Sequence, residues 1–251
     1  MSAAINLTVG YIPYRNMAPF HQQFGPIPLQ QGDVAMQFQT LSPRALGLEA
    51  EAGRIDAGAL SLVDGLKLDD TFEPLGNFGI GVKRAAASVL LFSKKPMSEL
   101  TGVCAVTDET ATSIRLLEVL FEKRYNNPII SYGRIASSLL FDGEADALLL
   151  IGDEALRAKT TGIKGLPVIT DLGEEWFVWQ GTPFVFARWM VRKSLPPLAK
   201  ATLQKALERS LDSFPVDSDP YLSGFCYRLT DGHQQSTERF KQLTETSCLK
   251  R

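Results

Sequence analysis

Asn16 is the first residue of this chain whose type and position suggest ligand chemistry. It lies in the segment VGYIPYRNMAPF (residues 9–20), after an apolar run and in a loop that contains two prolines. An amide offers two hydrogen-bond donors and one acceptor at fixed angles, and the rings of Tyr11 and Tyr14 would form walls around a ligand. The alternative is an Asx turn, in which Asn16 hydrogen-bonds only to its own backbone. Residue type and spacing leave both interpretations open.

Ser88 is the second candidate, at the start of the apolar segment SVLLFS. Its hydroxyl could donate a hydrogen bond to a ligand carboxylate. It could equally satisfy a neighbouring backbone group, which is the commoner role of such a serine. No histidine is adjacent in the sequence, and the chain contains no G-x-S-x-G motif. A serine hydrolase is therefore poorly supported.

Hydroxyl groups crowd the segment VTDETATSIRLLEVLF, where a strand is expected to turn into a helix. The free N–H groups and the dipole at a helix N-terminus favour an anion. Ordinary N-capping by one hydroxyl explains the same pattern, and Asp108 and Glu109 at this turn would weaken the attraction for an anionic ligand. The candidate ligand-binding residues here are Thr107, Thr112 and Ser113.

Two other segments carry carboxylates. Gly152 and Asp153 follow an apolar run, where glycine permits close approach of a ligand to the backbone. Asp153 would bind a ligand hydroxyl or cap the following helix, and the cap is slightly favoured. Glu174 and Glu175 resemble a catalytic carboxylate pair, but neighbours in one short segment need not face one site, and the nearby tryptophans are more typical of a core. We therefore predict site roles for Gly152 and Asp153 and give the glutamate pair little weight.

Composition argues against several classes of protein. The net charge is −2, with acidic and basic residues mixed along the chain, so nucleic acid or an anionic membrane is a poor candidate for a partner. Three scattered cysteines without a C-x-x-C motif indicate free thiols in a reducing compartment. Two histidines without a local ligand cluster argue against a structural metal. Signal-peptide, membrane-span, dinucleotide, P-loop and zincin patterns are absent, and we expect a soluble cytoplasmic protein.

Strand-like and helix-like segments alternate, which is typical of an α/β fold. Helical periodicity and caps predict helices at residues 43–53, 112–124, 196–214 and 231–245. Apolar runs predict strands at residues 5–12, 55–62, 87–93, 101–107, 145–152, 166–172 and 183–191. The candidate residues therefore lie at or just beyond the ends of predicted strands, or in the first turn of a helix.

One sequence pattern occurs twice. Gly-x-x-Asp-Ala stands at residues 53–57 in EAGRIDAGALSL and at residues 143–147 in FDGEADALLLIG. In each copy the glycine can end a helix, and the short aspartate can turn the chain into an apolar strand. The pattern could recur by chance, because Gly-x-x-Asp-Ala is common in loops between a helix and a strand. Alternatively, it recurs because the protein contains two similar lobes. Two α/β lobes usually hold a ligand in the cleft between them, at the carboxyl ends of the strands.

With these segments identified, the chain resembles the menaquinone-biosynthesis family that includes chorismate dehydratase. The matching segments run in family order over essentially the whole chain, and DALLLIGDEAL with DLGEEW and GTPFVFARW is the most specific part. The others are YIPYRNMAPF, GRIDAGALS, ASVLLFSKKP, TSIRLLEVLF and YLSGFCYRL. The resemblance implies an α/β, two-lobed fold like that of type-2 periplasmic binding proteins, with mixed sheets flanked by helices and a ligand cleft between the lobes. We expect one lobe of residues 1–94 plus 186–251 and another of residues 95–185.

The resemblance also implies an activity. It implies a carbon–oxygen lyase that needs no cofactor and removes water from chorismate to give 3-enolpyruvylbenzoate. In the family an asparagine and a serine hold the enolpyruvyl carboxylate, which itself is thought to act as the base. Asn16 and Ser88 stand at the matching positions, and Thr112 and Ser113 match hydroxyls at the anion-binding start of a helix.

Two comparisons with related sequences qualify this expectation. The sister family that makes dihydroxynaphthoate relies on a histidine in the cleft, whereas His21 and His233 are expected to lie outside it. Members of the dehydratase family often carry an arginine before the TS dipeptide, where this chain has Ala111 after an acidic turn. Because like charges repel, the alternative is a divergent, non-catalytic protein of the same fold that binds a less anionic carboxylate. Either way the expected partner is a small molecule, and the chain is expected to be a monomer or a homodimer.

Overall fold

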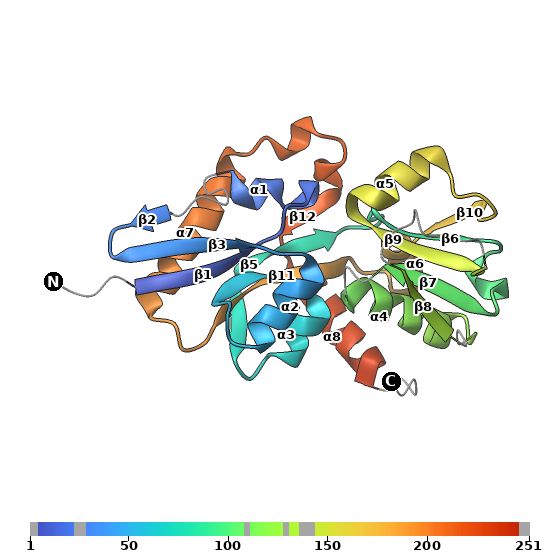
Figure 1. The fold of residues 1–251 in the computed structure, drawn as a ribbon, viewed down its shortest axis with the longest axis horizontal. Coiled ribbons are helices and arrows are strands. Elements are labelled where there is room, and N and C mark those ends of the chain that lie inside the picture. The colour runs from blue at the N-terminus through green and yellow to red at the C-terminus, as the bar shows by residue number, and fades with distance from the viewer. Residues whose placement is uncertain (1–4, 23–28, 108–110, 128–130, 136–143, 246–251) are drawn as a thin grey trace. The chain divides into compact units, whose positions relative to one another are not determined.

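Strands and helices alternate along the chain, which confirms the predicted α/β class (Figure 1). The structure, a computed structural model, describes residues 5–22, 29–107, 111–127, 131–135 and 144–245. The chain divides into two compact units, each made of two chain segments. Unit 1 comprises Met1–Gly81 with Phe186–Thr230, and unit 2 comprises Val82–Val185 with Asp231–Arg251.

Unit 1 is built on a mixed sheet whose described strands follow the order β12-β5-β11-β4-β1-β3-β2. β1 is parallel to β3 and β4, and β11 is antiparallel to β4. The carboxyl ends of β1 and β4 therefore lie at the same edge as the beginning of β11. The strands are β1 (Ile5–Tyr11), β2 (Leu29–Gln31), β3 (Val34–Thr40), β4 (Ala57–Ser61), β5 (Phe72–Val82), β11 (Phe184–Arg192) and β12 (Phe225–Arg228). The helical segments are η1 (Arg15–Met17), α1 (Ala18–His21), α2 (Pro43–Glu51), α3 (Leu62–Lys67), α7 (Pro197–Ser213), η5 (Val216–Ser218) and η6 (Leu222–Gly224).

Two glycines let helix α2 approach this sheet closely. A Cβ atom on Gly10 would lie 2.1 Å from a side-chain carbon of Leu46, and one on Gly58 would lie 3.1 Å from it. Leu46 is fully buried, so its side chain fills the space that these neighbouring strands leave open. Gly10 ends the apolar part of β1, and the close packing of α2 holds the strand whose following loop contains Asn16.

Unit 2 contains a second mixed sheet, in the order β10-β6-β9-β7-β8 among the described residues. β7 is parallel to β8 and β9, while β6 is antiparallel to β9 and β10. The strands are β6 (Val89–Ser93), β7 (Val103–Thr107), β8 (Ser131–Ile135), β9 (Ala147–Ile151) and β10 (Val168–Asp171). The helical segments are η2 (Met97–Glu99), α4 (Ala111–Val119), η3 (Leu120–Arg124), α5 (Gly152–Thr161), α6 (Leu172–Gln180) and α8 (Asp231–Glu245).

The first copy of the repeated pattern begins β4, the central strand of unit 1. Gly53 adopts φ +80° just after α2, as expected for a glycine that ends a helix. Asp56 N donates to Thr8 O at 2.8 Å, and Arg192 N donates to Asp56 O at 2.8 Å. Arg192 Nε also lies 3.5 Å from a carboxylate oxygen of Asp56. The aspartate thus joins the start of β4 to a parallel strand on one side and an antiparallel strand on the other.

The second copy builds the same connections in unit 2. Asp146 N donates to Val103 O at 2.9 Å, and Lys94 N donates to Asp146 O at 3.0 Å. Lys94 Nζ forms an ion pair with the Asp146 carboxylate at 3.0 Å. Gly143 lies outside the described residues. The shared bonding around the two aspartates favours repetition of a structural unit over chance as the explanation of the pattern.

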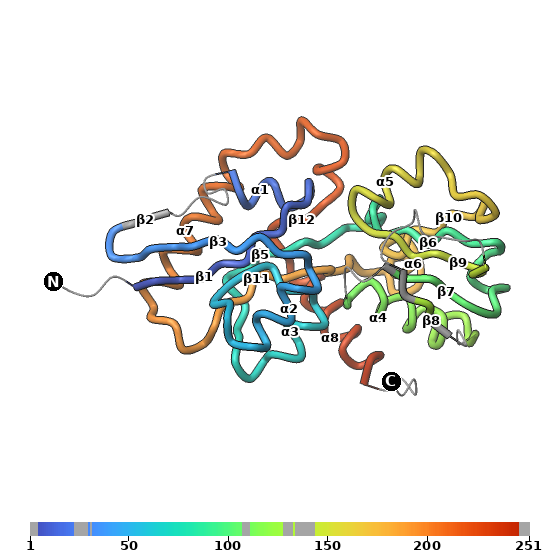
Figure 2. Tube along the Cα trace, in the orientation of Figure 1, coloured from blue at the N-terminus to red at the C-terminus, as the bar shows by residue number. Residues whose placement is uncertain are grey.

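The compact units differ from the predicted lobes of residues 1–94 plus 186–251 and 95–185 at two places. β6 belongs to unit 2, because it pairs with β9 on one side and β10 on the other. α8 also belongs to unit 2, because Phe240 packs against Trp176 and Phe184, with ring centroids 5.9 and 5.3 Å apart. The chain passes from one unit to the other within β5, within β11 and before α8 (Figure 2).

Sequence patterns located helices α2, α4, α7 and α8 but gave no ranges for α1, α3, α5 and α6, and they missed several strands. β2, β3, β5, β8 and β12 were not expected. β5 contains Pro74 and three glycines, residue types that are depleted in strands, so its extended course depends on pairing within the sheet. The helix expected at residues 112–124 is α4 continued by a π-helical turn, η3. None of the described helices is both long enough and apolar enough to cross a membrane.

Candidate functional site

The segment after β1 in unit 1 carries three of the predicted site residues. Tyr11 ends the strand, and Tyr14 and Asn16 follow it in the turn that leads into α1. The side-chain oxygen of Asn16 is buried and accepts no hydrogen bond from a described residue. The turn is closed by the backbone, since Met17 N donates to Tyr14 O at 2.9 Å. Within the described chain, Asn16 therefore does not form the Asx turn that was its alternative role.

Arg15 holds this turn in place within unit 1. Its Nη2 lies 2.6 Å from Asp219 Oδ2, and its guanidinium carbon lies 5.2 Å from the ring centroid of Tyr221. The hydrogen bond from Arg15 lowers the pKa of Asp219, assisted by backbone N–H groups of Tyr221 and Leu222. The residue next to Asn16 is thus tied to the η5–η6 segment, far along the chain.

His21 lies beside a predicted site residue, although sequence reasoning set it aside. Its ring centroid is 4.3 Å from that of Tyr11 and 6.3 Å from that of Trp189. Only 8% of His21 is exposed, and burial lowers its pKa to about 4, so the imidazole is neutral at pH 7. The available sequence signal was its position five residues after Asn16. His233, by contrast, is buried in α8 of unit 2.

Ser88 and Gly152 are brought together at one edge of the sheet in unit 2. β6 and β9 are antiparallel with Val89 opposite Ile151, and Gly152 N donates to Ser88 O at 2.8 Å. Gly152 has φ +61°, a conformation that glycine adopts without steric cost. Ser88 is buried, and its Oγ donates to Ala86 O at 3.4 Å. The hydroxyl thus has the backbone partner that was the alternative to a ligand, and its contact with a ligand stays a prediction.

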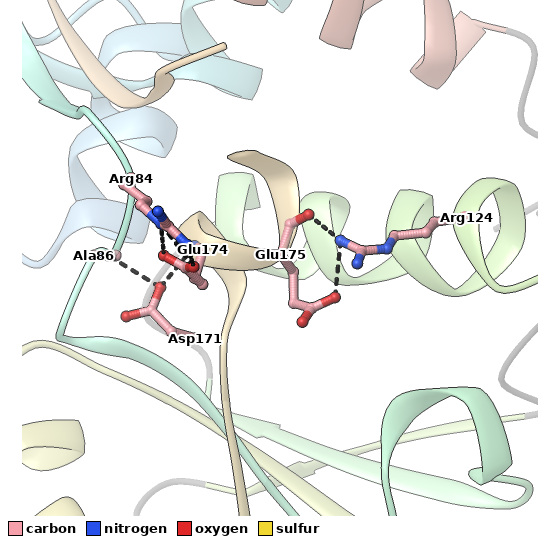
Figure 3. A network of polar contacts seen from close by, with 6 residues as sticks. All are labelled: Arg84, Ala86, Arg124, Asp171, Glu174 and Glu175. Atoms are coloured by element: carbon pink, nitrogen blue, oxygen red, sulfur yellow. Dashed lines mark hydrogen bonds and ion pairs between the residues drawn. The ribbon is translucent and has the colours of Figure 1, made fainter. Parts of the chain in front are cut away.

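The carboxylate of Asp171 fixes the loop that leads to Ser88 (Figure 3). Oδ1 accepts from Ala86 N at 2.9 Å, and Oδ2 accepts from Ala87 N at 2.7 Å. Oδ1 also caps α6 by accepting from two N–H groups of its first turn at 2.9 and 3.1 Å. Ala87 has φ +58°, which is unfavourable for a residue with a Cβ atom. One carboxylate therefore both begins a helix and holds a strained residue next to Ser88.

The neighbouring carboxylates Glu174 and Glu175 have separate partners (Figure 3). Both oxygens of Glu174 accept from Arg84 Nε, at 2.7 and 2.8 Å, and this bond lowers the pKa of Glu174. Glu175 pairs with Arg124 Nη1 at 2.9 Å and accepts the hydroxyl of Tyr125. Burial, followed by the bond to Glu175, raises the pKa of Tyr125 to about 12. Each carboxylate is bound to a different arginine, which is the arrangement of structural ion pairs.

The hydroxyl-rich segment of unit 2 lies at the same sheet edge. Thr107 ends β7, and β7 is parallel to β9, so Thr107 lies near the end of β9 that leads to Gly152. Thr112 and Ser113 are in the first turn of α4, and both are buried. Residues 108–110, which include the two acids of the turn, lie outside the described residues. The sheet topology thus gathers these candidates at one edge without showing that they contact a ligand.

Asp153 does not cap a helix. α5 begins at Gly152 with Ile151 as its N-cap, and no side chain makes the capping hydrogen bond. Asp153 is instead the second residue of the helix, with an exposed side chain, so the favoured capping role was wrong. Its negative charge still complements the helix dipole, and the exposed carboxylate is accessible to a ligand hydroxyl.

Metal and thiol chemistry find little support in the part of the chain that the structure describes. No group of three or more His, Cys, Asp or Glu side chains there could hold a metal ion. Cys104 is buried in β7, and burial raises the pKa of its thiol to about 12. A nucleophilic thiolate at this position is therefore disfavoured at neutral pH.

Solved structures with this fold are numerous and distant in sequence. A protein of Archaeoglobus fulgidus matches with a TM-score of 0.65 and 14% identity, over 96% of this chain and 97% of that one. A Candida albicans protein described as having the generic periplasmic binding protein fold matches at 0.63 and 12%, over 98% and 92%. The periplasmic aliphatic sulphonate binding protein of Escherichia coli matches at 0.57 and 12%, over 97% and 86%. These likenesses confirm the predicted periplasmic-binding-protein-like fold.

Relatives by sequence point to one pathway. Chorismate dehydratase of Thermus thermophilus is 28% identical over 267 residues, which cover 93% of this chain and 93% of that protein. Chorismate dehydratase of Campylobacter jejuni is 26% identical over 181 residues, which cover 72% of this chain and 65% of that protein. A sequence model of the menaquinone biosynthesis family matches residues 7–219, a range that contains all the candidate residues. The chain therefore belongs to the menaquinone biosynthesis family.

Proposed function

We propose that this protein is a lyase that removes water from chorismate to give 3-enolpyruvylbenzoate in menaquinone biosynthesis. The observation that carries the proposal is the family match over residues 7–219, together with a chorismate dehydratase that aligns with 93% of the chain. The periplasmic-binding-protein-like fold supports it, since such folds commonly bind small molecules at the carboxyl ends of their strands.

The reaction requires a proton and a hydroxide to leave neighbouring ring carbons. The proton leaves the carbon that bears the enolpyruvyl ether, the hydroxide leaves the next carbon, and the ring gains its third double bond. Because the product is aromatic, the protein mainly has to orient the substrate and assist removal of the proton. The enolpyruvyl carboxylate of the substrate acts as the base, and an intramolecular base held in position has a high effective concentration.

Asn16 and Ser88 are the residues proposed to hold this carboxylate. Asn16 Oδ1 accepts no hydrogen bond within the described chain, and the two N–H groups of the same amide are the donors that we assign to the anion. The bond from Ser88 Oγ to Ala86 O is long, at 3.4 Å, so a shorter bond to a charged acceptor would be stronger. His21 is a poor alternative base, because burial lowers its pKa to about 4.

The other candidates are proposed to contact the rest of the substrate. The half-buried rings of Tyr11 and Tyr14 offer apolar surface to the ring of chorismate. The polar contacts proposed for unit 2 come from Thr107, Thr112, Ser113, Gly152 and Asp153. The buried positions of Thr112 and Ser113 require that α4 shift slightly for such contacts to form.

Turnover of chorismate tests the proposal directly. Purified protein is incubated with saturating chorismate, and the aromatic product is followed by absorbance and identified by its mass, one water less than the substrate. A heat-denatured sample controls for spontaneous decay of chorismate. Absence of enzymatic product from a folded protein contradicts the proposal. If chorismate is then recovered unchanged while raising the melting temperature, the protein is a binding protein of the same fold.

A further inference from the structure

Arg188 is a charged residue of β11 in unit 1 with an unusual position. β11 is antiparallel to β4 and places Arg188 opposite Leu60, one residue before β4 ends at Ser61. Residues directly opposite each other in an antiparallel pair point to the same face, so Arg188 shares a face with the fully buried Leu60. This is the sheet edge at which β1 also ends and the loop containing Asn16 begins.

The guanidinium of Arg188 has no partner among the residues that the structure describes. It forms no ion pair or hydrogen bond with any described residue, and its Nε is buried without an acceptor. Burial lowers the pKa of Arg188, whereas carboxylate partners raise the pKa of Arg54 and Arg84. Arg188 is half-buried, and a partly desolvated charge without a protein partner costs stability, so the fold itself does not explain this residue.

The corresponding sheet position in unit 2 holds an uncharged residue. Leu60 in β4 and Leu150 in β9 both stand four residues after the aspartate of the repeated pattern. The residue opposite Leu150 is Leu90, as Arg188 is opposite Leu60. Leu90 is buried in an apolar cluster. Because the same strand arrangement has a leucine at this position in unit 2, the charge of Arg188 is not needed to form the sheet.

We infer that Arg188 binds a carboxylate of the substrate at this edge of unit 1 and thereby determines specificity for an anionic ligand. A guanidinium offers paired N–H donors that match the two oxygens of a carboxylate. The identification of that ligand as chorismate rests on the proposed function. Chorismate has two carboxylates, so Arg188 binds the ring carboxylate while Asn16 and Ser88 hold the enolpyruvyl carboxylate.

Three variants test this role in the turnover assay. Arg188→Leu copies the matched residue of unit 2, Arg188→Lys keeps the charge without the paired donors, and Arg209→Leu on the exposed surface of α7 is the control. We expect Arg188→Leu to raise the KM for chorismate about tenfold or more, since a hydrogen-bonded charge pair is lost. Arg188→Lys should be intermediate, and the control should stay within about twofold. Circular dichroism and thermal melting establish that each variant is folded.

Calorimetric binding of isophthalate separates this inference from the proposed function. Isophthalate carries two carboxylates on a ring and cannot lose water. Wild type is expected to bind it about tenfold or more tightly than Arg188→Leu. If chorismate is not turned over but isophthalate binding depends on Arg188, the proposed function fails and the inference stands. A wild-type KM in Arg188→Leu, equal isophthalate affinity in the two proteins, or no isophthalate binding by wild type overturns it.

Discussion

The sheets of the two units have the same strand arrangement around a central aspartate, but the polar side chains at their edges differ in whether they have protein partners. In both, an aspartate joins the central strand to a parallel neighbour and an antiparallel neighbour. At the edge of unit 2, Asp171 accepts four backbone N–H groups, and Glu174 and Glu175 each bind an arginine. At the edge of unit 1, Asn16 Oδ1 and Arg188 Nε are buried without a hydrogen-bond partner among the described residues.

This difference separates a structural role from a binding role. Polar groups that satisfy one another hold a loop in one conformation, as Asp171 does for the loop before Ser88. A partly desolvated guanidinium without a partner gains from an anionic ligand, whereas Asn16 Oδ1 can only accept a hydrogen bond and gains only from a ligand donor such as a hydroxyl. We therefore expect substitutions in the network of unit 2 to change stability, and substitutions of Asn16 and Arg188 in unit 1 to change activity and ligand affinity.

Substitution of Asp171 should destabilise the protein more than any other change considered below. Asp171→Ala removes a helix cap and two hydrogen bonds to the loop before Ser88, which should lower the free energy of unfolding by about 3 kcal/mol. Urea unfolding measures this. Asp153→Ala is the matched control, because Asp153 is also in the first turn of a helix but is exposed and does not cap it, and it should change stability by about 0.5 kcal/mol or less. A similar effect of both substitutions would contradict the structural role of Asp171.

The second prediction concerns pH and unit 1. The pKa of His21 is about 4 in the folded chain and 6.5 in the unfolded chain, so the unfolded chain binds a proton first as the pH falls. The contribution of His21 to the free energy of unfolding is fully present above pH 6.5. It decreases by about 3 kcal/mol as the pH falls to 4.

The variant His21→Phe keeps an aromatic ring against Tyr11 and Trp189 but cannot take up a proton. Urea unfolding at several pH values should therefore show a weaker loss of stability in acid than for wild type. His233 is the histidine of unit 2 with which His21 is compared, because burial lowers the pKa of His233 as well. An unchanged acid dependence in His21→Phe would mean that other groups cause it.

The third prediction concerns activity. Asn16→Ala should reduce kcat/KM for chorismate about 100-fold, the loss typical of a hydrogen-bond donor to a reacting anion. Its free energy of unfolding should change by about 0.5 kcal/mol or less, because no hydrogen bond to Asn16 Oδ1 is present in the described chain. Asn77→Ala is the control, since the Asn77 side chain donates to Leu229 O at an exposed position. Loss of stability without loss of rate would instead indicate a structural role for Asn16.

The smallest effect tests the strained loop of unit 2. Ala87 and Gly152 both have positive φ, at +58° and +61°. Ala87→Gly should raise the free energy of unfolding by about 0.5 kcal/mol, because relief of strain exceeds the entropic cost of glycine. Gly152→Ala should lower it by about 1 kcal/mol for the same steric reason. Thermal unfolding of both variants measures the opposite signs, and a loss of stability in Ala87→Gly would show that the loop is not strained.

Local sequence patterns account for the alternation of strands and helices, for the aspartates that begin β4 and β9, and for the family. These depend on residues close together in the chain: apolar runs, helix caps and short motifs. The candidate residues could also be placed at strand ends, because Tyr11, Thr107 and Gly152 directly terminate or follow apolar runs.

Which of these polar groups have partners depends on contacts between segments that are distant in the sequence. Asp171 binds Ala86, 85 residues away in the chain, and the separation of Glu174 from Glu175 depends on two distant arginines. The contact of His21 with Tyr11 and the assignment of α8 to unit 2 likewise arise from packing. Such long-range contacts leave no periodic signal in the sequence, because side chains meet in space according to sheet register and helix packing, not their separation along the chain.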